Sequence, residues 1–212
     1  MAQYFFSPLL QYPSSGELRQ TDRFQYDVGY TMPNRNQNVT IVGCTGSLAN
    51  VAATDELFVY AHGDYRTKKL YTKVGSQEFI SPNQLADILK ARGLHDHQGL
   101  VVNLFACTSG VVGEDGRSMA HLLALNLHRC GYRQLKVRGY VGFVQVNDGL
   151  DLQVAKRFGG DLQQAQGVAS NNKSATARGV VYNLNGTINS GHEGRGIETR
   201  RGNETHFRIR NL

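Results

Sequence analysis

The stretch GLVVNLFACTSG, Gly99 to Gly110, decides the fold that the sequence predicts. It begins with an apolar run, Leu100 to Phe105, which is short, partly β-branched and bounded by turn residues. A run of this kind is typical of a buried parallel strand. Cys107 follows at the end of that strand, and a polar loop comes next. Because ligands of open α/β sheets bind outside the carboxyl ends of the strands, Cys107 lies where a site is expected.

A second run, Glu56 to Ala61, has the same form and ends in His62-Gly63-Asp64. If the two strands are parallel and close in the sheet, His62 and Cys107 emerge at the same edge. The segment between them is long enough for a crossover helix. A thiol and an imidazole at one edge are the parts of a cysteine nucleophile and its base. We interpret Asp64 as a loop carboxylate, because aspartate favours turns.

The crossover helix is predicted between Ser81 and Gly93. Ser81 is an N-cap candidate, Pro82 suits the first helical position, and Gly93 suits the end of the helix. Its apolar stripe consists of Leu85, Ile88 and Leu89. A second helix is predicted over residues 117–128, followed by a strand over residues 135–146 that is bulged at its glycines.

The order strand, His-Gly, then strand, Ala-Cys-x-x-Gly, resembles the caspase-like (clan CD) cysteine peptidases. This group includes caspases, gingipains, separases, CHAT proteases and the autoprocessing domains of large bacterial toxins. Here the motif reads Phe105-Ala106-Cys107-Thr108-Ser109-Gly110. It lacks the Gln that precedes Ala in caspases and has one extra residue before Gly. The chain is therefore more similar to the bacterial, CHAT and toxin-autoprocessing branches, over residues 39–146.

This resemblance implies a caspase-like three-layer α/β sandwich with a mainly parallel central sheet. It implies that Cys107 is the nucleophile, that His62 is the general acid/base, and that the amides of Gly63 and Cys107 bind the oxyanion. The strand after the Cys helix lines the substrate groove in this group. The corresponding candidates here are Gly139, Tyr140, Val141, Gly142 and Phe143.

The length of 212 residues suits one α/β domain. Residues 1–38 are expected to form an N-terminal extension with an edge strand at Arg23–Val28, and residues 39–158 the caspase-like core. A turn is expected at Asn147–Gly149. Residues 159–212 are expected to form a hairpin-rich extension of the same domain. Asn185-Gly186 predicts a hairpin with a type I′ turn, and a second hairpin is predicted around residues 200–204.

The net charge is +6, and several arginines gather near the C-terminus: Arg195, Arg200, Arg201, Arg208 and Arg210. An excess of basic residues indicates either an ordinary solvated surface or a polyanion as binding partner. Nucleic acid is not expected, because no DNA- or RNA-binding motif stands beside these residues. We interpret His95-Asp96-His97 as a surface turn. Zinc sites normally need four ligands, and the sequence places no third or fourth ligand nearby, so no metal site is expected.

No apolar run reaches 18 residues, so no membrane span is expected. The N-terminus lacks the features of a signal peptide. The three cysteines do not have the spacing of a disulfide framework. This favours free thiols and therefore a reducing compartment. These observations predict a cytoplasmic protein, or one delivered into a host or target cell by a route independent of a signal peptide.

Three functions follow from these observations. The first is a cysteine endopeptidase, a bacterial effector or toxin-processing domain acting on a protein or peptide substrate. The second is an inactive caspase-like domain with a binding or adhesin-type role. The third is a polyanion-binding module that uses the basic C-terminal region. No cofactor is required, but the toxin relatives are activated by an inositol phosphate, which would connect the first and third functions.

Overall fold

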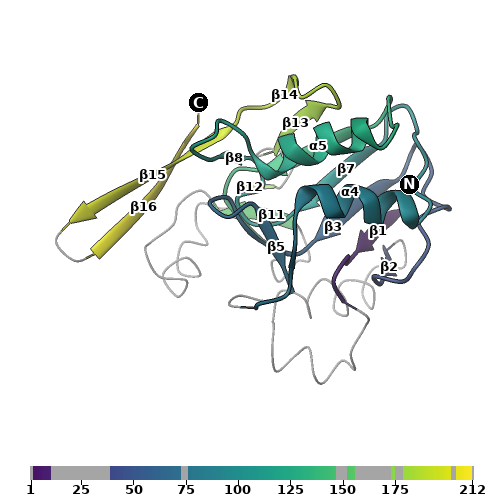
Figure 1. The fold of residues 1–212 in the computed structure, drawn as a ribbon, viewed down its shortest axis with the longest axis horizontal. Coiled ribbons are helices and arrows are strands. Elements are labelled where there is room, and N and C mark those ends of the chain that lie inside the picture. Colours follow the sequence, from purple (N-terminus) through teal and green to yellow (C-terminus); the bar gives the residue numbers. More distant parts are fainter. Residues whose placement is uncertain are drawn as a thin grey trace.

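The strand β7 (Val101–Phe105) lies inside a seven-stranded sheet in the computed structural model, between β3 (Glu56–Tyr60) and β9 (Lys136–Tyr140). The strand order is β14-β13-β9-β7-β3-β1-β2 (Figure 1). The structure describes residues 2–10, 39–72, 76–146, 152–155, 173–174, 179–201 and 204–211. Side chains are not described for residues 143, 145–146, 152–155, 173–174 and 196–211.

Most neighbouring strands of this sheet run parallel. The strands β2 (Val39–Val42), β1 (Gln3–Phe6), β3, β7 and β9 form a parallel set. On the other side of β9, β13 (Gly179–Asn183) and β14 (Ile188–Ser190) continue the sheet in antiparallel pairs. The α/β class and the mainly parallel sheet predicted from the sequence are therefore confirmed.

Two helices cover one face of the sheet, α4 (Pro82–Ala91) and α5 (Met119–Arg129). At the start of α4, the Ser81 side chain accepts a hydrogen bond from the Gln84 amide at 3.3 Å. The Gln84 side chain accepts one from the Ser81 amide at 2.9 Å. This capping box, with Pro82 in the first turn, confirms the predicted helix start. Gly93, with φ of +81°, follows the helix as expected.

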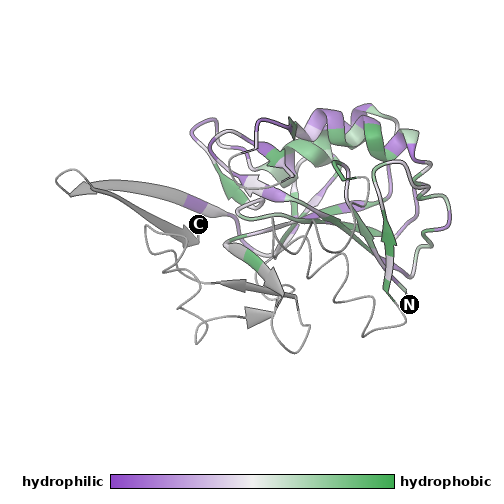
Figure 2. Ribbon diagram, turned by 90° about the horizontal axis from the view of Figure 1, so that it is seen from below, coloured by the Kyte–Doolittle hydropathy of each residue, from purple (hydrophilic) through white to green (hydrophobic). Residues whose placement is uncertain are grey.

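Successive side chains along each strand point to opposite faces of the sheet. One face contributes aliphatic side chains to a core shared with α4 and α5: Leu57, Val59, Val102, Leu104, Val137, Leu85, Leu89, Leu123 and Leu127. Figure 2 shows the hydrophobic sides of the helices turned toward the sheet. The opposite face carries an aromatic cluster that includes Phe5, Phe58, Tyr60, Phe105 and Tyr140. The described residues thus show one helical layer on the sheet, and the third layer of the sandwich stays a prediction.

Strand β1 comes from the segment that was expected to be an N-terminal extension. It pairs with β2 on one side and β3 on the other. Phe5 and Phe6 are fully buried, one on each face of the sheet. A boundary at residue 39 therefore does not separate β1 from the core. The expected edge strand at 23–28 and the turn at 147–149 lie outside the described residues.

The strand expected over residues 135–146 is divided into two, which corrects that prediction. β9 ends at Tyr140, and β10 (Phe143–Val146) belongs to another sheet, with β11 (Leu152–Ala155) and β12 (Lys173–Ser174). The physical reason is Gly142, whose φ of +137° is a conformation that a continuous strand does not contain.

The hairpin of β13 and β14 is confirmed, but its turn is not type I′. A type I′ turn needs positive φ at both central residues, and within this described turn only Gly186 has it. Asn183 instead accepts a hydrogen bond from the Gly186 amide at 2.9 Å and donates one to the Thr187 carbonyl at 2.9 Å. The Asn185 side chain accepts from the Thr187 amide at 3.0 Å. This pattern fits a type I turn followed by a left-handed glycine.

A second hairpin is also confirmed. β15 (Gly194–Arg201) pairs with β16 (Glu204–Asn211), and at its base β15 runs parallel to β8 (Val111–Val112). In Figure 1 this hairpin projects away from the central sheet. No helix in the described part of the chain is both long enough and apolar enough to cross a membrane.

Candidate active site

His62 and Cys107 occupy matching places beyond the ends of neighbouring strands. The parallel register of β3 and β7 pairs Tyr60 with Phe105, and each candidate lies two residues further along its strand direction. Neighbouring strands lie about 4.8 Å apart. His62 is the first residue of β4 (His62–Asp64), and both it and Cys107 are half-buried. The two strands are therefore parallel neighbours, which is the condition under which His62 and Cys107 emerge at one edge of the sheet.

Gly63 brings the histidine segment against the cysteine segment. A Cβ atom on residue 63 would lie 2.5 Å from the Cys107 carbonyl oxygen and 3.0 Å from the Ala106 Cβ. It would also lie 3.0 Å from the Met119 Cε at the start of α5. Real Cβ atoms essentially never approach a backbone oxygen so closely, so the contact requires glycine. The residue beside His62 thus packs directly on the backbone of Cys107.

The loop after Cys107 is fixed to the body of the protein by buried hydrogen bonds. The Ser109 hydroxyl donates to the Leu104 carbonyl at 2.8 Å and accepts from the Tyr140 amide at 2.9 Å. The Gly110 amide donates to the Tyr140 carbonyl at 2.9 Å, and the Ser109 carbonyl accepts from the Ala120 amide at 2.9 Å. The thiol-bearing loop is therefore held by β7, β9 and α5 together.

Thr108 was not singled out from the sequence, and it connects the pieces of the site. Its φ of +58° lies in the left-handed region. Its amide donates to the Gly142 carbonyl at 2.7 Å. Its hydroxyl donates to the Cys107 carbonyl at 2.6 Å and accepts from the Tyr65 amide at 3.2 Å. Threonine rarely adopts positive φ, so a threonine at this position does not predict the left-handed conformation.

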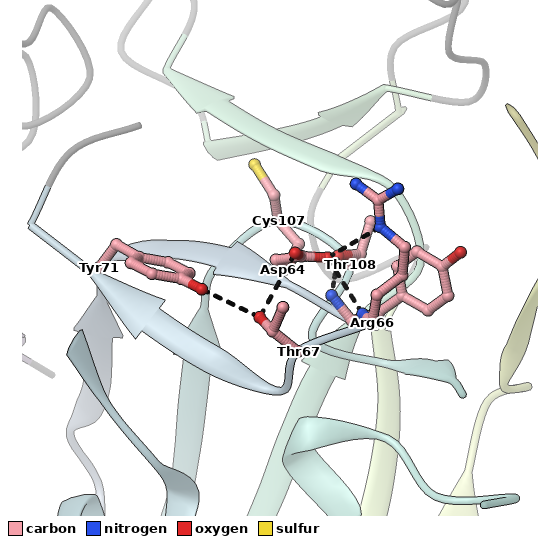
Figure 3. Close-up of polar contacts among 7 residues, drawn as sticks. Asp64, Arg66, Thr67, Tyr71, Cys107 and Thr108 are labelled. Atoms are coloured by element: carbon pink, nitrogen blue, oxygen red, sulfur yellow. Dashed lines mark hydrogen bonds and ion pairs between the residues drawn. The ribbon is translucent and has the colours of Figure 1, made fainter. Parts of the chain in front are cut away.

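Asp64 is the last residue of β4 and leads into the turn of the hairpin formed by β4 and β5 (Lys69–Tyr71), whose sheet also contains β6 (Phe79–Ile80). Its carboxylate accepts hydrogen bonds from the Arg66 amide at 3.0 Å and the Thr67 hydroxyl at 3.3 Å. The hydroxyls of Thr67 and Tyr71 lie 3.0 Å apart. Figure 3 shows the Cys107 side chain pointing away from this polar group. The Asp64 carboxylate thus binds the turn that follows β4, but the residue itself ends a strand rather than lying in the predicted loop.

The predicted substrate wall, residues 139–143, divides into parts with different surroundings. A Cβ on Gly139 would lie 2.6 Å from the Ala120 Cβ and 2.9 Å from the Gly110 nitrogen, so this glycine serves close packing. The Tyr140 side chain is fully buried, and its hydroxyl donates to the Asn103 side chain at 3.3 Å. Burial raises the pKa of Tyr140. The Tyr140 side chain is therefore part of the core and unavailable to a substrate.

The other positions of the wall lie nearer to the Cys loop. Val141 is buried in a small cluster with Tyr65 and Val111. The Gly142 carbonyl accepts from the Thr108 amide. The side chain of Phe143 lies outside the described residues. Substrate binding at these positions stays a prediction.

All three cysteines are thiols rather than disulfides, and all are half-buried. The Cys130 thiol lies 3.5 Å from an Asp87 oxygen. Burial, followed by the neighbouring Asp87 carboxylate, raises the pKa of Cys130. This environment disfavours the reactive thiolate and agrees with a structural role. Among the described side chains, no group of three or more His, Cys, Asp or Glu residues could hold a metal ion.

The fold and site define an α/β protein with an imidazole and a thiol at the carboxyl ends of adjacent parallel strands. A comparison with known protein families finds no family model that matches the chain, and a comparison with curated proteins finds no match either.

Proposed function

We propose that this protein is a cysteine endopeptidase in which Cys107 is the nucleophile and His62 is the general acid/base. One observation carries the proposal: the His62–Gly63 segment packs on the Cys107 backbone, beyond the ends of adjacent parallel strands. Paired nucleophile and base residues at one edge of a sheet are the parts that acyl transfer requires. The resemblance to caspase-like peptidases supports the same roles.

In the proposed reaction, His62 takes the thiol proton and the Cys107 sulfur attacks the peptide carbonyl carbon. The new carbon–sulfur bond pushes the carbonyl π electrons onto oxygen. Collapse of this intermediate breaks the carbon–nitrogen bond, and the leaving amine takes the proton from the His62 imidazolium. Water then attacks the thioester carbon and His62 accepts the water proton. Cleavage of the carbon–sulfur bond releases the carboxylic acid product, and the imidazolium returns its proton to the sulfur, which restores the thiol.

The oxyanion of both intermediates needs N–H donors that are in place beforehand. We assign this role to the amides of Gly63 and Cys107. The close packing at residue 63 supports the assignment, because it fixes the two backbone segments relative to each other. A side chain at residue 63 would separate them.

Cleavage of an unfolded protein mixture tests this proposal, with mass spectrometry identifying the new amino termini. Wild type, Cys107→Ala and Cys44→Ala are compared, each with and without inositol hexakisphosphate as a candidate activator. We expect wild type and Cys44→Ala to produce the same new termini, and Cys107→Ala to produce none. Equal cleavage by Cys107→Ala, or no cleavage by wild type in either condition, would reject the proposal.

A second candidate function, polyanion binding, rests on the hairpin of β15 and β16. Its uninterrupted register places four arginines on one face, together with Glu204: Arg195, Arg201, Arg208 and Arg210. Arg200 lies on the other face by the same register. Clustered arginines attract phosphate-rich ligands through charge.

Titration with inositol hexakisphosphate at two salt concentrations tests this second function. Arg208→Gln should weaken binding, and Arg200→Gln, which removes the same charge from the other face, should weaken it less. Equal losses in both variants would indicate attraction by net charge rather than by this face.

A further inference from the structure

We propose that Thr108 is a positioning residue that sets the geometry of Cys107 relative to the strand bearing His62. This inference rests on the proposed function of Cys107 and His62. The Thr108 hydroxyl contacts the Cys107 carbonyl and the Tyr65 amide. It acts through the backbone of Cys107 and through the hairpin that His62 begins.

The backbone of Thr108 is held in an unfavourable conformation. Its φ is +58°, and a β-branched residue avoids the left-handed region because its side chain crowds the backbone. In the described part of the chain, Lys68 is the only other residue besides glycine with positive φ. Such conformations persist where surrounding contacts over-determine them, and they cluster at functional sites.

The Thr108 hydroxyl acts both as a hydrogen-bond donor and as a hydrogen-bond acceptor. The hydroxyl donates to the Cys107 carbonyl at 2.6 Å and accepts from the Tyr65 amide at 3.2 Å. The Thr108 amide donates to the Gly142 carbonyl at 2.7 Å. The residue is 5% exposed, so water does not readily replace these bonds. One side chain therefore joins the cysteine loop to the residue after the β4 strand.

Two contacts restrain the carbonyl oxygen of Cys107. The Thr108 hydroxyl donates a hydrogen bond to it, and Gly63 packs closely against it. This fixes the peptide plane that follows Cys107 and limits the rotation of the Cys107 backbone. Loss of the hydroxyl would let the cysteine loop move relative to the β4–β5 hairpin. A small displacement between nucleophile and base lowers reactivity strongly.

The test measures the rate of Cys107 alkylation by iodoacetamide from pH 5 to pH 10, with the melting temperature of each variant. Thr108→Val keeps the β-branched shape and removes the hydroxyl, whereas Thr108→Ser keeps the hydroxyl. Tyr132→Phe is the matched control, because it removes the hydroxyl of a side chain that is equally buried, and that hydroxyl donates to the Leu94 carbonyl instead. His62→Ala supplies the rate without the base.

We expect Thr108→Val to slow alkylation at pH 7 by about tenfold and to move the pH profile toward that of an ordinary thiol. Thr108→Ser should stay within about threefold of wild type, as a rescue by the retained hydroxyl. Tyr132→Phe should lower the melting temperature without moving the pH profile. In the His62→Ala background, Thr108→Val should have no further effect.

Three outcomes would overturn the proposal, and they are distinguishable. If wild type reacts faster than His62→Ala but Thr108→Val keeps the wild-type profile, the positioning role alone is rejected. If Tyr132→Phe moves the profile as much as Thr108→Val, the effect of Thr108 is structural. If wild type and His62→Ala react equally, the proposed dyad is rejected together with the positioning role.

Discussion

The carbonyl oxygen of Cys107 lies against Gly63, so close that a Cβ on residue 63 would be only 2.5 Å from it. This contact joins two segments that are far apart in the sequence and that carry the proposed base and nucleophile. It depends on the parallel pairing of β3 with β7, which brings the two strand ends to one edge. The absence of a side chain at residue 63 is thus a condition for the proposed site.

Gly63→Ala tests that condition. The added methyl group would push against a backbone oxygen, the Ala106 side chain and Met119. Overpacking of this kind costs about 1–3 kcal/mol of stability. We expect the free energy of unfolding, measured by urea denaturation, to fall by that amount, and the alkylation rate of Cys107 to fall with it.

Gly113→Ala is the matched control for that substitution. The nearest atoms to a Cβ at residue 113 are the flexible end of the Lys68 side chain, at 3.2 and 3.3 Å, which can move. This variant should leave both stability and alkylation close to wild type. Equal behaviour of Gly63→Ala and Gly113→Ala would show that the close packing at residue 63 has no consequence.

The alkaline stability of the protein depends in part on Tyr132. This side chain is 5% exposed, and its hydroxyl donates to the Leu94 carbonyl at 2.8 Å. Burial raises the pKa of Tyr132 to about 12, from an ordinary value of 10.0. Between these values the unfolded chain releases the proton and the folded protein keeps it. Stability therefore falls as pH rises, by up to about 1.4 kcal/mol per pH unit.

Tyr132→Phe should remove this contribution to the pH dependence. We expect the difference in unfolding free energy between wild type and variant to shrink from pH 10 to pH 12, measured by urea denaturation at each pH. Burial also raises the pKa of Tyr140 and Tyr182, but those groups are present in both proteins. A constant difference across this range would contradict the effect assigned to Tyr132.

The ion pair between Lys68 and Asp115 links the β4–β5 turn to the loop after β8. The hydrogen bond from Lys68 is the main cause of the lowered pKa of Asp115. A lowered pKa means that the stabilisation is present above the ordinary value of 3.8 and is lost as pH falls through the folded-state value. The Asp115 side chain is 51% exposed, so solvent screening limits the contribution to at most about 1 kcal/mol.

Asp115→Asn should therefore lower the free energy of unfolding by less than about 1 kcal/mol at pH 7. The difference from wild type should shrink as the pH is lowered below 3.8 and as salt is added. Glu114→Gln, at the neighbouring exposed position, is the control for removing one negative charge. A larger effect of Glu114→Gln would show that net charge matters more than this pair.

Local patterns were sufficient to predict the elements that position the candidate site. The apolar runs that became β3 and β7 and the Ser81-Pro82 start of α4 are all readable from neighbouring residues. The crossover between β3 and β7 is compatible with adjacent parallel strands, and the observed pairing establishes that they are neighbours. These features place His62 and Cys107 at one edge of the sheet.

Other features depend on contacts that no local pattern encodes. β1 comes from a segment rich in polar residues, and its place between β2 and β3 is set by long-range pairing. The break after β9 depends on the conformation of Gly142, and a glycine in an apolar run is also compatible with a simple bulge. The left-handed conformation of Thr108 is likewise imposed by Gly142, Tyr65 and Cys107, all brought together by the fold.

The central claim, an activated thiol at Cys107 that depends on His62, is tested most directly by brief alkylation with limiting iodoacetamide near neutral pH. Peptide mapping of wild type, His62→Ala and Cys107→Ala then reports each thiol separately, and Cys44 and Cys130 are internal controls. We expect fast labelling confined to Cys107 in wild type and slow labelling in His62→Ala. Labelling of Cys107 no faster than that of Cys44 and Cys130, or unchanged by His62→Ala, would contradict the claim.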